Sequence, residues 1–150
     1  MTEGKPRVLT LDELNAFGTD EAVDFFLSCC RSTKWAKSMS ECRPFWNLQI
    51  VGNAADTIWQ YLTPEDWREA LRGRRTAPAI PLTAELREGL ERYEAKFGYM
   101  FLLDPESPTA KDALPVLQKR LENPLQHEIK VAAAQEGIIM RKEIRTRIRG

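Results

Sequence analysis

Three arginines within four residues are the part of the sequence best suited to chemistry. Arg72, Arg74 and Arg75 stand in the stretch LRGRRTAPAIP, directly after a segment with helical spacing. A guanidinium group presents five N–H donors in a rigid fork and keeps its charge at neutral pH, so the stretch could bind a carboxylate or nucleic acid. A solvated basic turn is the alternative, because cations at the end of a helix complement its dipole.

The charge balance of the chain narrows these alternatives. The sequence holds 22 basic and 22 acidic residues, and its formal net charge is zero. No overall positive field therefore draws the protein to nucleic acid or to an anionic lipid surface. The basic segment MRKEIRTRIRG at the end of the sequence is interpreted in the same way, as a solvated helix end. We expect neither nucleic acid nor a membrane as a partner.

Other catalytic chemistry has little support in the sequence. His127 is the single histidine, and it lacks the paired spacing of a zinc site. Cys29 and Cys30 lie in an amphipathic segment with no histidine nearby, which favours buried structural thiols over a nucleophile. No nucleophile elbow, phosphate-binding loop or dinucleotide fingerprint occurs. We therefore expect no metal site.

The elements that must position these residues are helices. Capping signals open most of them, for example the capping box at 10–13 and the proline that follows Thr63 at the first helical position. Apolar residues at three- and four-residue spacing continue each segment. We expect helices over these ranges: 10–17, 19–30, 33–43, 48–62, 63–73, 83–97, 109–121 and 124–144.

This pattern predicts an all-α fold, a single-domain multi-helix bundle of about seven to nine helices. The apolar run at 99–103 could form a strand, but one isolated strand would lack a partner for its backbone groups. We place an N-terminal tail at residues 1–9 and the helical domain at 10–150. The tryptophans are expected to be core or interface anchors rather than a stacking platform for bases. They are Trp35, Trp46, Trp59 and Trp67.

The sequence also bears on where the protein acts. The first ten residues hold no apolar run of signal-peptide length, and no segment approaches the apolar length of a membrane span. The three cysteines are odd in number, which suits a reducing compartment better than a disulfide framework. We expect a soluble, cytoplasmic protein.

Five motifs, taken in sequence order, resemble one family. They are CCRSTKWAKSMSECRPF, AADTIWQYL, DWREAL, RYEAKFGYMFLL and LQKRLENPLQHEIKVAAAQE. Together they are similar to the decarboxylases of 2-oxo-4-hydroxy-4-carboxy-5-ureidoimidazoline (OHCU), which complete the conversion of urate to (S)-allantoin. The resemblance runs from about Leu11 to the C-terminus. It implies an all-helical, commonly dimeric enzyme that uses no cofactor.

The resemblance places the arginine stretch at the catalytic site of that family. The family has a His-Pro pair there, whose histidine is the acid/base, and these two positions fall on Arg74 and Arg75. The family then carries a Ser-x-x-Glu-Gln segment, whose glutamate partners the histidine. The stretch between Arg75 and Leu86 is shortened in this chain and has no such segment.

Two further parts of the family's pocket can be carried over. Phe97-Gly98-Tyr99 matches the family's Phe-Gly-Phe, whose backbone lines the substrate pocket. The family's arginine on the last helix falls near Glu143 or Ile144, and the neighbouring candidates are Arg141 and Arg145. We take Arg145 as the candidate substrate contact.

Arg74 cannot act as a general base in place of histidine, because its pKa is too high to release a proton at neutral pH. It can bind a carboxylate in a bidentate fork or stabilise developing negative charge. The first hypothesis is a divergent enzyme with decarboxylase, lyase or cyclase-type chemistry on a small anionic substrate such as a carboxylated heterocycle. The second is the OHCU decarboxylase itself with a rebuilt site. The third is a non-catalytic binding or interaction module.

Overall fold

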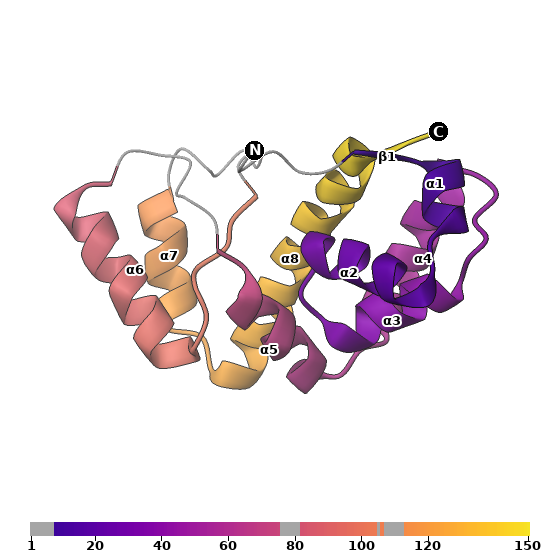
Figure 1. Ribbon diagram of the computed structural model, residues 1–150. Coiled ribbons are helices and arrows are strands. Elements are labelled where there is room, and N and C mark those ends of the chain that lie inside the picture. Colours follow the sequence, from indigo (N-terminus) through magenta and orange to yellow (C-terminus); the bar gives the residue numbers. More distant parts are fainter. Residues whose placement is uncertain (1–7, 76–81, 105, 107–112) are drawn as a thin grey trace. The chain divides into compact units, whose positions relative to one another are not determined.

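A computed structural model describes residues 8–75, 82–104, 106 and 113–150. Within these ranges the chain forms eight helices and two very short strands, so the predicted all-α class is confirmed (Figure 1). The elements are β1 Leu9–Thr10, α1 Leu11–Ala16, α2 Thr19–Cys29, α3 Thr33–Glu41, α4 Leu48–Gln60, α5 Pro64–Gly73, α6 Ala84–Phe97, α7 Ala113–Leu121, α8 Leu125–Arg147 and β2 Ile148–Arg149.

The helix starts follow the capping chemistry expected from the sequence. Thr10 and Glu13 form the reciprocal capping box of α1, and Ser32 accepts a hydrogen bond from the Trp35 amide at the start of α3. For α2 the sequence predicts Thr19 as the capping residue, whereas in the structure Gly18 is the cap and Thr19 is already helical. The first four residues of the helix predicted at 109–121 lie outside the described residues.

The chain divides into two compact units, one of which is discontinuous in sequence. The first unit comprises Met1–Leu62 with Ile139–Gly150, and the second comprises Thr63–Ile138. No helix in the described ranges is both long enough and apolar enough to cross a membrane.

Aromatic side chains fill the core of the first unit. The ring of Phe26 meets Trp35 edge-on with centroids 5.7 Å apart, and it packs against Phe45 in the same manner. Trp35 is fully buried, and its indole N–H donates to the backbone oxygen of Ala55 at 3.1 Å. A buried tryptophan thus gains a partner for its one polar group. Trp46 is not part of this core, since the residue is 86 % exposed, and its alternative role as an interface anchor stays a prediction.

The two strands pair with each other in parallel, and the sequence pattern did not predict this. Leu9 lies opposite Ile148, and Thr10 lies opposite Arg149. Leu9 and Ile148 are both almost fully buried, so their side chains anchor the pair in the first unit. Two residues per strand are too few to show an alternating pattern, so the strands leave no signal in the sequence.

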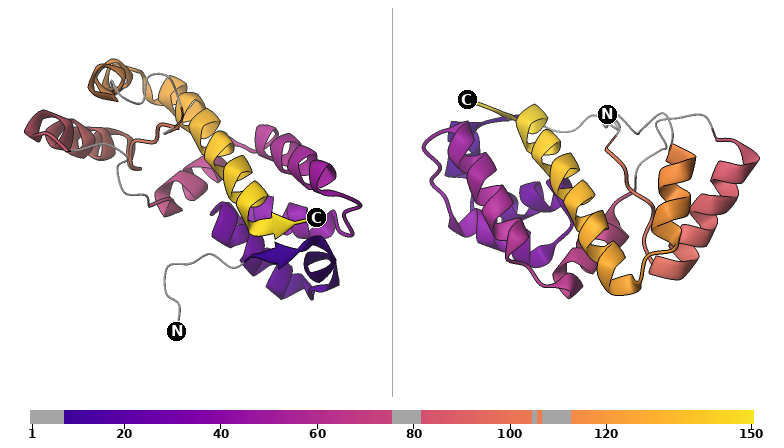
Figure 2. Two further views of the ribbon diagram at one scale, coloured as in Figure 1. Left: turned by 90° about the horizontal axis from the view of Figure 1, so that it is seen from above. Right: turned by 180° about the vertical axis from the view of Figure 1, so that it is seen from behind.

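The second unit consists of α5, α6, α7 and the first part of α8. Helices α6 and α7 lie side by side in every view (Figure 2). Gly89 allows this close approach, since a Cβ atom there would lie 2.7 Å from Leu117 Cδ2. The predicted strand alternative at 99–103 is not taken, because these residues form neither a helix nor a strand.

Candidate functional site

Helix α5 carries the arginine stretch at its C-terminal end. Thr63 and Asp66 form a reciprocal capping box, and Pro64 occupies the first helical position. At the other end, the Arg74 amide donates to the Leu71 carbonyl at 3.2 Å, and the backbone of Arg74 turns to an extended conformation. Arg74 is therefore the residue at which the chain leaves the helix.

The side chain of Arg74 forms a bidentate ion pair with Glu136 on α8. Its Nε donates to Oε1 at 2.9 Å and its Nη2 donates to Oε2 at 2.6 Å. The side chain of Glu136 is fully buried, and that of Arg74 is only 13 % exposed. Parallel N–H···O bonds of this kind are among the strongest polar contacts in proteins, so the orientation of the guanidinium is fixed.

This pair changes the electrostatics of the predicted anion site. A carboxylate buried without a partner would be strongly unfavourable, and Arg74 removes that cost for Glu136. Glu136 in turn neutralises the charge of Arg74. The pair as a whole is neutral, and its field at a distance is much weaker than that of a lone guanidinium.

Arg75 contacts the same helix that carries the Phe97-Gly98-Tyr99 motif. Its Nη1 lies 3.2 Å from Oε2 of Glu94, and both side chains are largely exposed. The backbone oxygen of Glu94 also accepts the Gly98 amide at 2.9 Å. Two of the predicted site residues, Arg75 and Gly98, are thus joined through one residue of α6.

The Phe97-Gly98-Tyr99 motif ends α6 and turns two aromatic rings inward. Gly98 has a φ of +88°, the left-handed conformation in which glycine has no steric cost. Phe97 and Tyr99 flank it with their rings stacked at 6.2 Å, and both are buried. Burial, helped by the nearby Glu128 carboxylate, raises the pKa of Tyr99 to about 12. Tyr99 therefore remains a neutral phenol at physiological pH.

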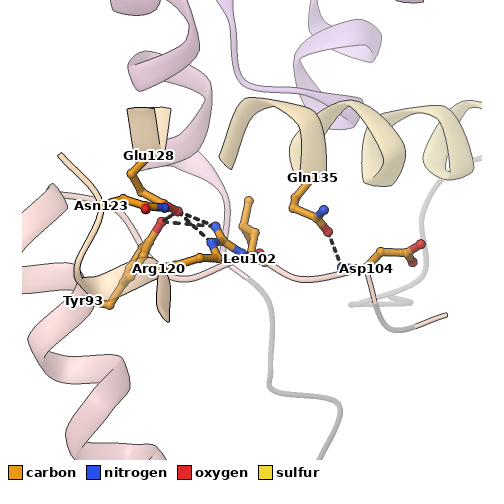
Figure 3. Close-up of polar contacts among 7 residues, drawn as sticks. All are labelled: Tyr93, Leu102, Asp104, Arg120, Asn123, Glu128 and Gln135. Atoms are coloured by element: carbon orange, nitrogen blue, oxygen red, sulfur yellow. Dashed lines mark hydrogen bonds and ion pairs between the residues drawn. The ribbon is translucent and has the colours of Figure 1, made fainter. Parts of the chain in front are cut away.

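Tyr93, whose ring packs against Phe97 and Tyr99, belongs to a buried polar cluster that was not predicted from the sequence. Figure 3 shows the polar contacts of this cluster. Glu128 is its centre. Oε2 of Glu128 accepts hydrogen bonds from the Tyr93 hydroxyl and from Arg120 Nε, the latter at 2.8 Å. Its Oε1 accepts from the Asn123 side chain at 2.9 Å. Arg120 also donates to the backbone oxygen of Leu102 at 2.7 Å.

The Glu128 carboxylate joins α6, α7 and α8, and Arg120 extends the cluster to the segment after α6 through the Leu102 oxygen. Burial, together with the hydrogen bond to Glu128, raises the pKa of Tyr93 above its usual range, so this hydroxyl stays protonated and donates. A sequence signal for the cluster did exist. Glu128 and Glu136 fall in register with the apolar stripe of Ala132 and Met140 on α8, and charged residues at buried positions require partners.

A comparison with known protein families matches most of the chain. The family model of OHCU decarboxylase covers residues 15–74 and 79–145. The chain belongs to this family. The membership confirms the resemblance inferred from the five motifs, and the family takes its name from an enzyme activity.

Individual relatives agree with the family match. A solved OHCU decarboxylase structure, determined in the presence of (S)-allantoin, is 27 % identical with a TM-score of 0.70, and the match covers 86 % of this chain and 97 % of that one. A solved (S)-allantoin synthase is 18 % identical with a TM-score of 0.72, covering 93 % of this chain and 54 % of the other, and it supports the fold.

A curated relative comes from a plant. The uric acid degradation bifunctional protein TTL of Arabidopsis thaliana is 25 % identical over 72 % of this chain. The match spans only 41 % of that protein's length. The similarity therefore concerns one part of a longer, bifunctional relative.

The match to the OHCU decarboxylase family breaks directly after Arg74. Its first segment ends at residue 74 and its second begins at residue 79. The predicted absence of the family's Ser-x-x-Glu-Gln segment between Arg75 and Leu86 stays a prediction. The carboxylate that contacts Arg74 in the structure is that of Glu136 on α8.

The arginines at the end of α8 belong to the first unit. Arg145, our sequence candidate, is exposed. Arg141 is more enclosed: it forms an ion pair with Asp56, and its Nη1 donates to the Gly52 oxygen at 3.1 Å. Gly52 provides the space, since a Cβ there would lie 2.7 Å from Arg141 Nη2.

The residues suited to metal or thiol chemistry are not gathered into a site. His127 is exposed, and the described residues contain no group of three or more possible metal ligands. The three cysteines form no disulfide; Cys29 and Cys30 are buried and Cys42 is exposed. This confirms the interpretation of mostly buried thiols rather than a disulfide framework.

Proposed function

We propose that the chain is a divergent OHCU-decarboxylase-like enzyme that acts without a cofactor on a small carboxylated substrate, preferably a heterocycle. Family membership supports a decarboxylase-type reaction connected with purine degradation. The observation that carries the proposal is the Arg74–Glu136 pair. The pair holds the mostly buried guanidinium of Arg74 in a defined orientation, at the position where the resemblance places the family's acid/base histidine.

The proposed mechanism leaves proton transfer to the substrate and to water. Arg74 orients the substrate through hydrogen bonds, since it cannot accept or release a proton. The bond to the carboxyl carbon breaks, carbon dioxide leaves, and the electron pair passes into the electron-poor ring of the substrate. A proton from water then takes the place of the carboxyl group. The protein's part is orientation and stabilisation of the negative charge in the ring.

The other proposed substrate contacts are Arg75, the backbone of Phe97 and Gly98, Tyr99 and Arg145. The shared contact of Arg75 and Gly98 with Glu94 supports the proposal that these two residues belong to one site. The homodimer implied by the resemblance and the cytoplasmic location expected from the sequence belong to the same proposal. Size-exclusion chromatography with light scattering measures the first of these, and a mass of one chain would contradict it.

Binding of carboxylated heterocycles tests the enzyme proposal. A ligand that binds only the folded protein raises its melting temperature, so a screen of such acids should identify stabilising compounds. The stabilisation should vanish in Arg74→Ala and should persist in Lys119→Ala, a matched control at a basic residue near the C-terminus of another helix. If no compound stabilises the wild-type protein, the proposal fails.

The parent reaction is tested separately. The protein is incubated with freshly generated OHCU, and the chirality of the allantoin formed is followed by circular dichroism. A rate equal to the uncatalysed background excludes OHCU as the substrate, whereas an excess of (S)-allantoin would assign the parent activity to this chain.

A non-catalytic binding or interaction module is the second candidate, and one observation favours it. Both arginines at the family's acid/base position already contact carboxylates of the chain itself, Arg74 with Glu136 and Arg75 with Glu94. A protein that had lost its chemistry could keep such pairs for stability. Failure of both the ligand screen and the OHCU assay would favour this candidate.

A further inference from the structure

Helix α4 presents an exposed face with an aromatic residue at each end. Trp46 comes just before the capping residue Asn47 and is 86 % exposed, whereas Tyr61 closes the helix and is 83 % exposed. Ile50, between them, is 42 % exposed. Apolar surface gains free energy when it leaves water, and Trp and Tyr are enriched among the residues that dominate binding at protein interfaces. This face therefore has the composition of a contact surface.

Six residues make up this face, which we call the α4 stripe. They are Trp46, Ile50, Asn53, Ala54, Thr57 and Tyr61, and all are exposed or partly exposed. Residues three or four positions apart lie on the same side of a helix, and the positions from 50 to 61 follow this spacing. Trp46 adjoins the N-terminal end of the stripe. Ala54 lies near its middle, where a small side chain lets a second helix approach closely.

The α4 stripe differs from the exposed faces of the other helices in charge. It holds no charged residue, and Asp56, the one charged residue of α4, pairs with Arg141 of the same chain. Each of the other seven helices in the described ranges has at least one exposed charged residue. A charged surface packed on the stripe would lose the hydration of its charges without gaining counter-charges. Among the helix faces of the described residues, the α4 stripe is therefore matched only by itself.

We propose that the α4 stripe is a dimerisation surface, on which the α4 stripe of a second copy packs in the antiparallel direction. In a two-fold symmetric contact, residue i of one copy touches residue j of the other, and j touches i in return. For antiparallel helices all such pairs must have the same midpoint. The residues of the stripe satisfy this condition, with a midpoint between residues 53 and 54. The pairs are Trp46 with Tyr61, Ile50 with Thr57, and Asn53 with Ala54.

This pairing puts the large side chains at the ends of the contact and the small ones at its centre. Aromatic side chains bury about 150–250 Å² each, so Trp46 and Tyr61 would contribute about 300–500 Å² per copy. A standard interface takes about 800 Å² from each partner. The two aromatic residues would thus supply about half of it. The pairing gives the proposed homodimer a defined surface and does not depend on the proposed reaction.

Single substitutions on the α4 stripe test whether it forms the dimer. The mass of the full chain is measured by sedimentation equilibrium over a range of micromolar concentrations. Trp46→Ala should raise the dissociation constant of the dimer roughly 30-fold or more, as for residues that dominate an interface. Gln118→Lys is the control, because it adds a charge at an exposed position of α7, and it should leave the constant unchanged. Circular dichroism and melting curves establish that each variant is folded.

A charge pair tests the antiparallel pairing itself. Ile50→Glu and Thr57→Lys should each be monomeric over the same range, because each would bury a charge against an uncharged group. Mixing the two variants should restore dimers that contain one copy of each. The introduced carboxylate then faces the introduced ammonium at one contact, and the unchanged Ile50 and Thr57 face each other at the second. Native mass spectrometry identifies the mixed dimer by its mass.

The outcomes separate this inference from the proposed function. A wild-type protein that is monomeric throughout the range overturns the inference together with the proposed homodimer, while the ligand screen still decides the reaction. A wild-type dimer that persists in Trp46→Ala and in Ile50→Glu overturns the inference alone, because the dimer then forms through another surface. Two monomeric variants whose mixture yields no dimer overturn the antiparallel pairing.

Discussion

The Glu136 carboxylate accepts hydrogen bonds from both Nε and Nη2 of Arg74, at 2.9 and 2.6 Å, and so links the end of α5 to α8. Arg74→Met would leave this carboxylate buried without its cationic partner. We expect a loss of about 3–5 kcal/mol in the free energy of unfolding, measured by urea denaturation. The double variant Arg74→Met/Glu136→Met should recover most of the loss.

Arg75→Met is the matched control, because its pair with Glu94 is exposed. Exposed ion pairs contribute about 0–1 kcal/mol, so this variant should be nearly as stable as the wild-type protein. Similar losses in Arg74→Met and Arg75→Met would contradict the structural importance of the buried pair.

Glu128 should be about as sensitive to substitution as Arg74. Glu128→Gln removes the charge that balances Arg120, and it leaves the Tyr93 hydroxyl with a weaker acceptor. A destabilisation of about 3–5 kcal/mol is expected from an unbalanced buried cation. The near-ultraviolet circular dichroism of the aromatic side chains should also change, since Tyr93 packs against Phe97 and Tyr99. An unchanged melting temperature in Glu128→Gln would argue against the cluster.

The stability of the protein should decrease at high pH because of Tyr99. Its pKa is about 12 in the folded protein and about 10 in a model peptide, so the folded state holds the phenol proton more tightly. The stabilisation is complete below pH 10 and is lost as the pH rises from 10 to 12. Tyr99→Phe should show a shallower decrease over this interval in urea denaturation.

The decrease in stability at high pH should not vanish in Tyr99→Phe, because the pKa of Tyr93 is also raised. Tyr61→Phe serves as the control, since Tyr61 is 83 % exposed. If Tyr99→Phe and Tyr61→Phe gave identical pH profiles, the effect assigned to Tyr99 would be wrong.

Gly98 should tolerate asparagine better than alanine. A Cβ atom at this position would meet no atom within 4 Å, so the cost of Gly98→Ala arises from the left-handed backbone. We expect Gly98→Ala to lose about 1 kcal/mol, and Gly98→Asn to lose less, because asparagine enters this conformation more readily. Melting temperatures measure the difference, and equal losses would point to a steric rather than a conformational cause.

The helices were predictable because their signals are local. The capping pairs at Thr10 and Thr63 and the glycine after Phe97 lie within a few residues of the ends they determine. The resemblance to the OHCU decarboxylases was predictable for a different reason, since it depends on the order of motifs rather than on contacts.

The partners of the candidate site could not be predicted in the same way. Arg74 and Glu136 are 62 residues apart, and Arg120, Tyr93 and Glu128 come from three helices. No short-range pattern connects such residues. The two glutamates on the apolar stripe of α8 indicate that partners must exist, but only the three-dimensional fold identifies them.

The pairing of Leu9 with Ile148 has a consequence for the order of synthesis. A ribosome makes Leu9 near the beginning of this sequence and Ile148 near its end, so β1 must wait for its partner strand until almost all 150 residues have been made. The second unit, Thr63–Ile138, is continuous and can collect all its contacts earlier. Although the first unit contains the earliest residues of this sequence, it is the last to be completed. Until then the aromatic side chains around Phe26 are exposed in the nascent chain, where apolar surface favours aggregation.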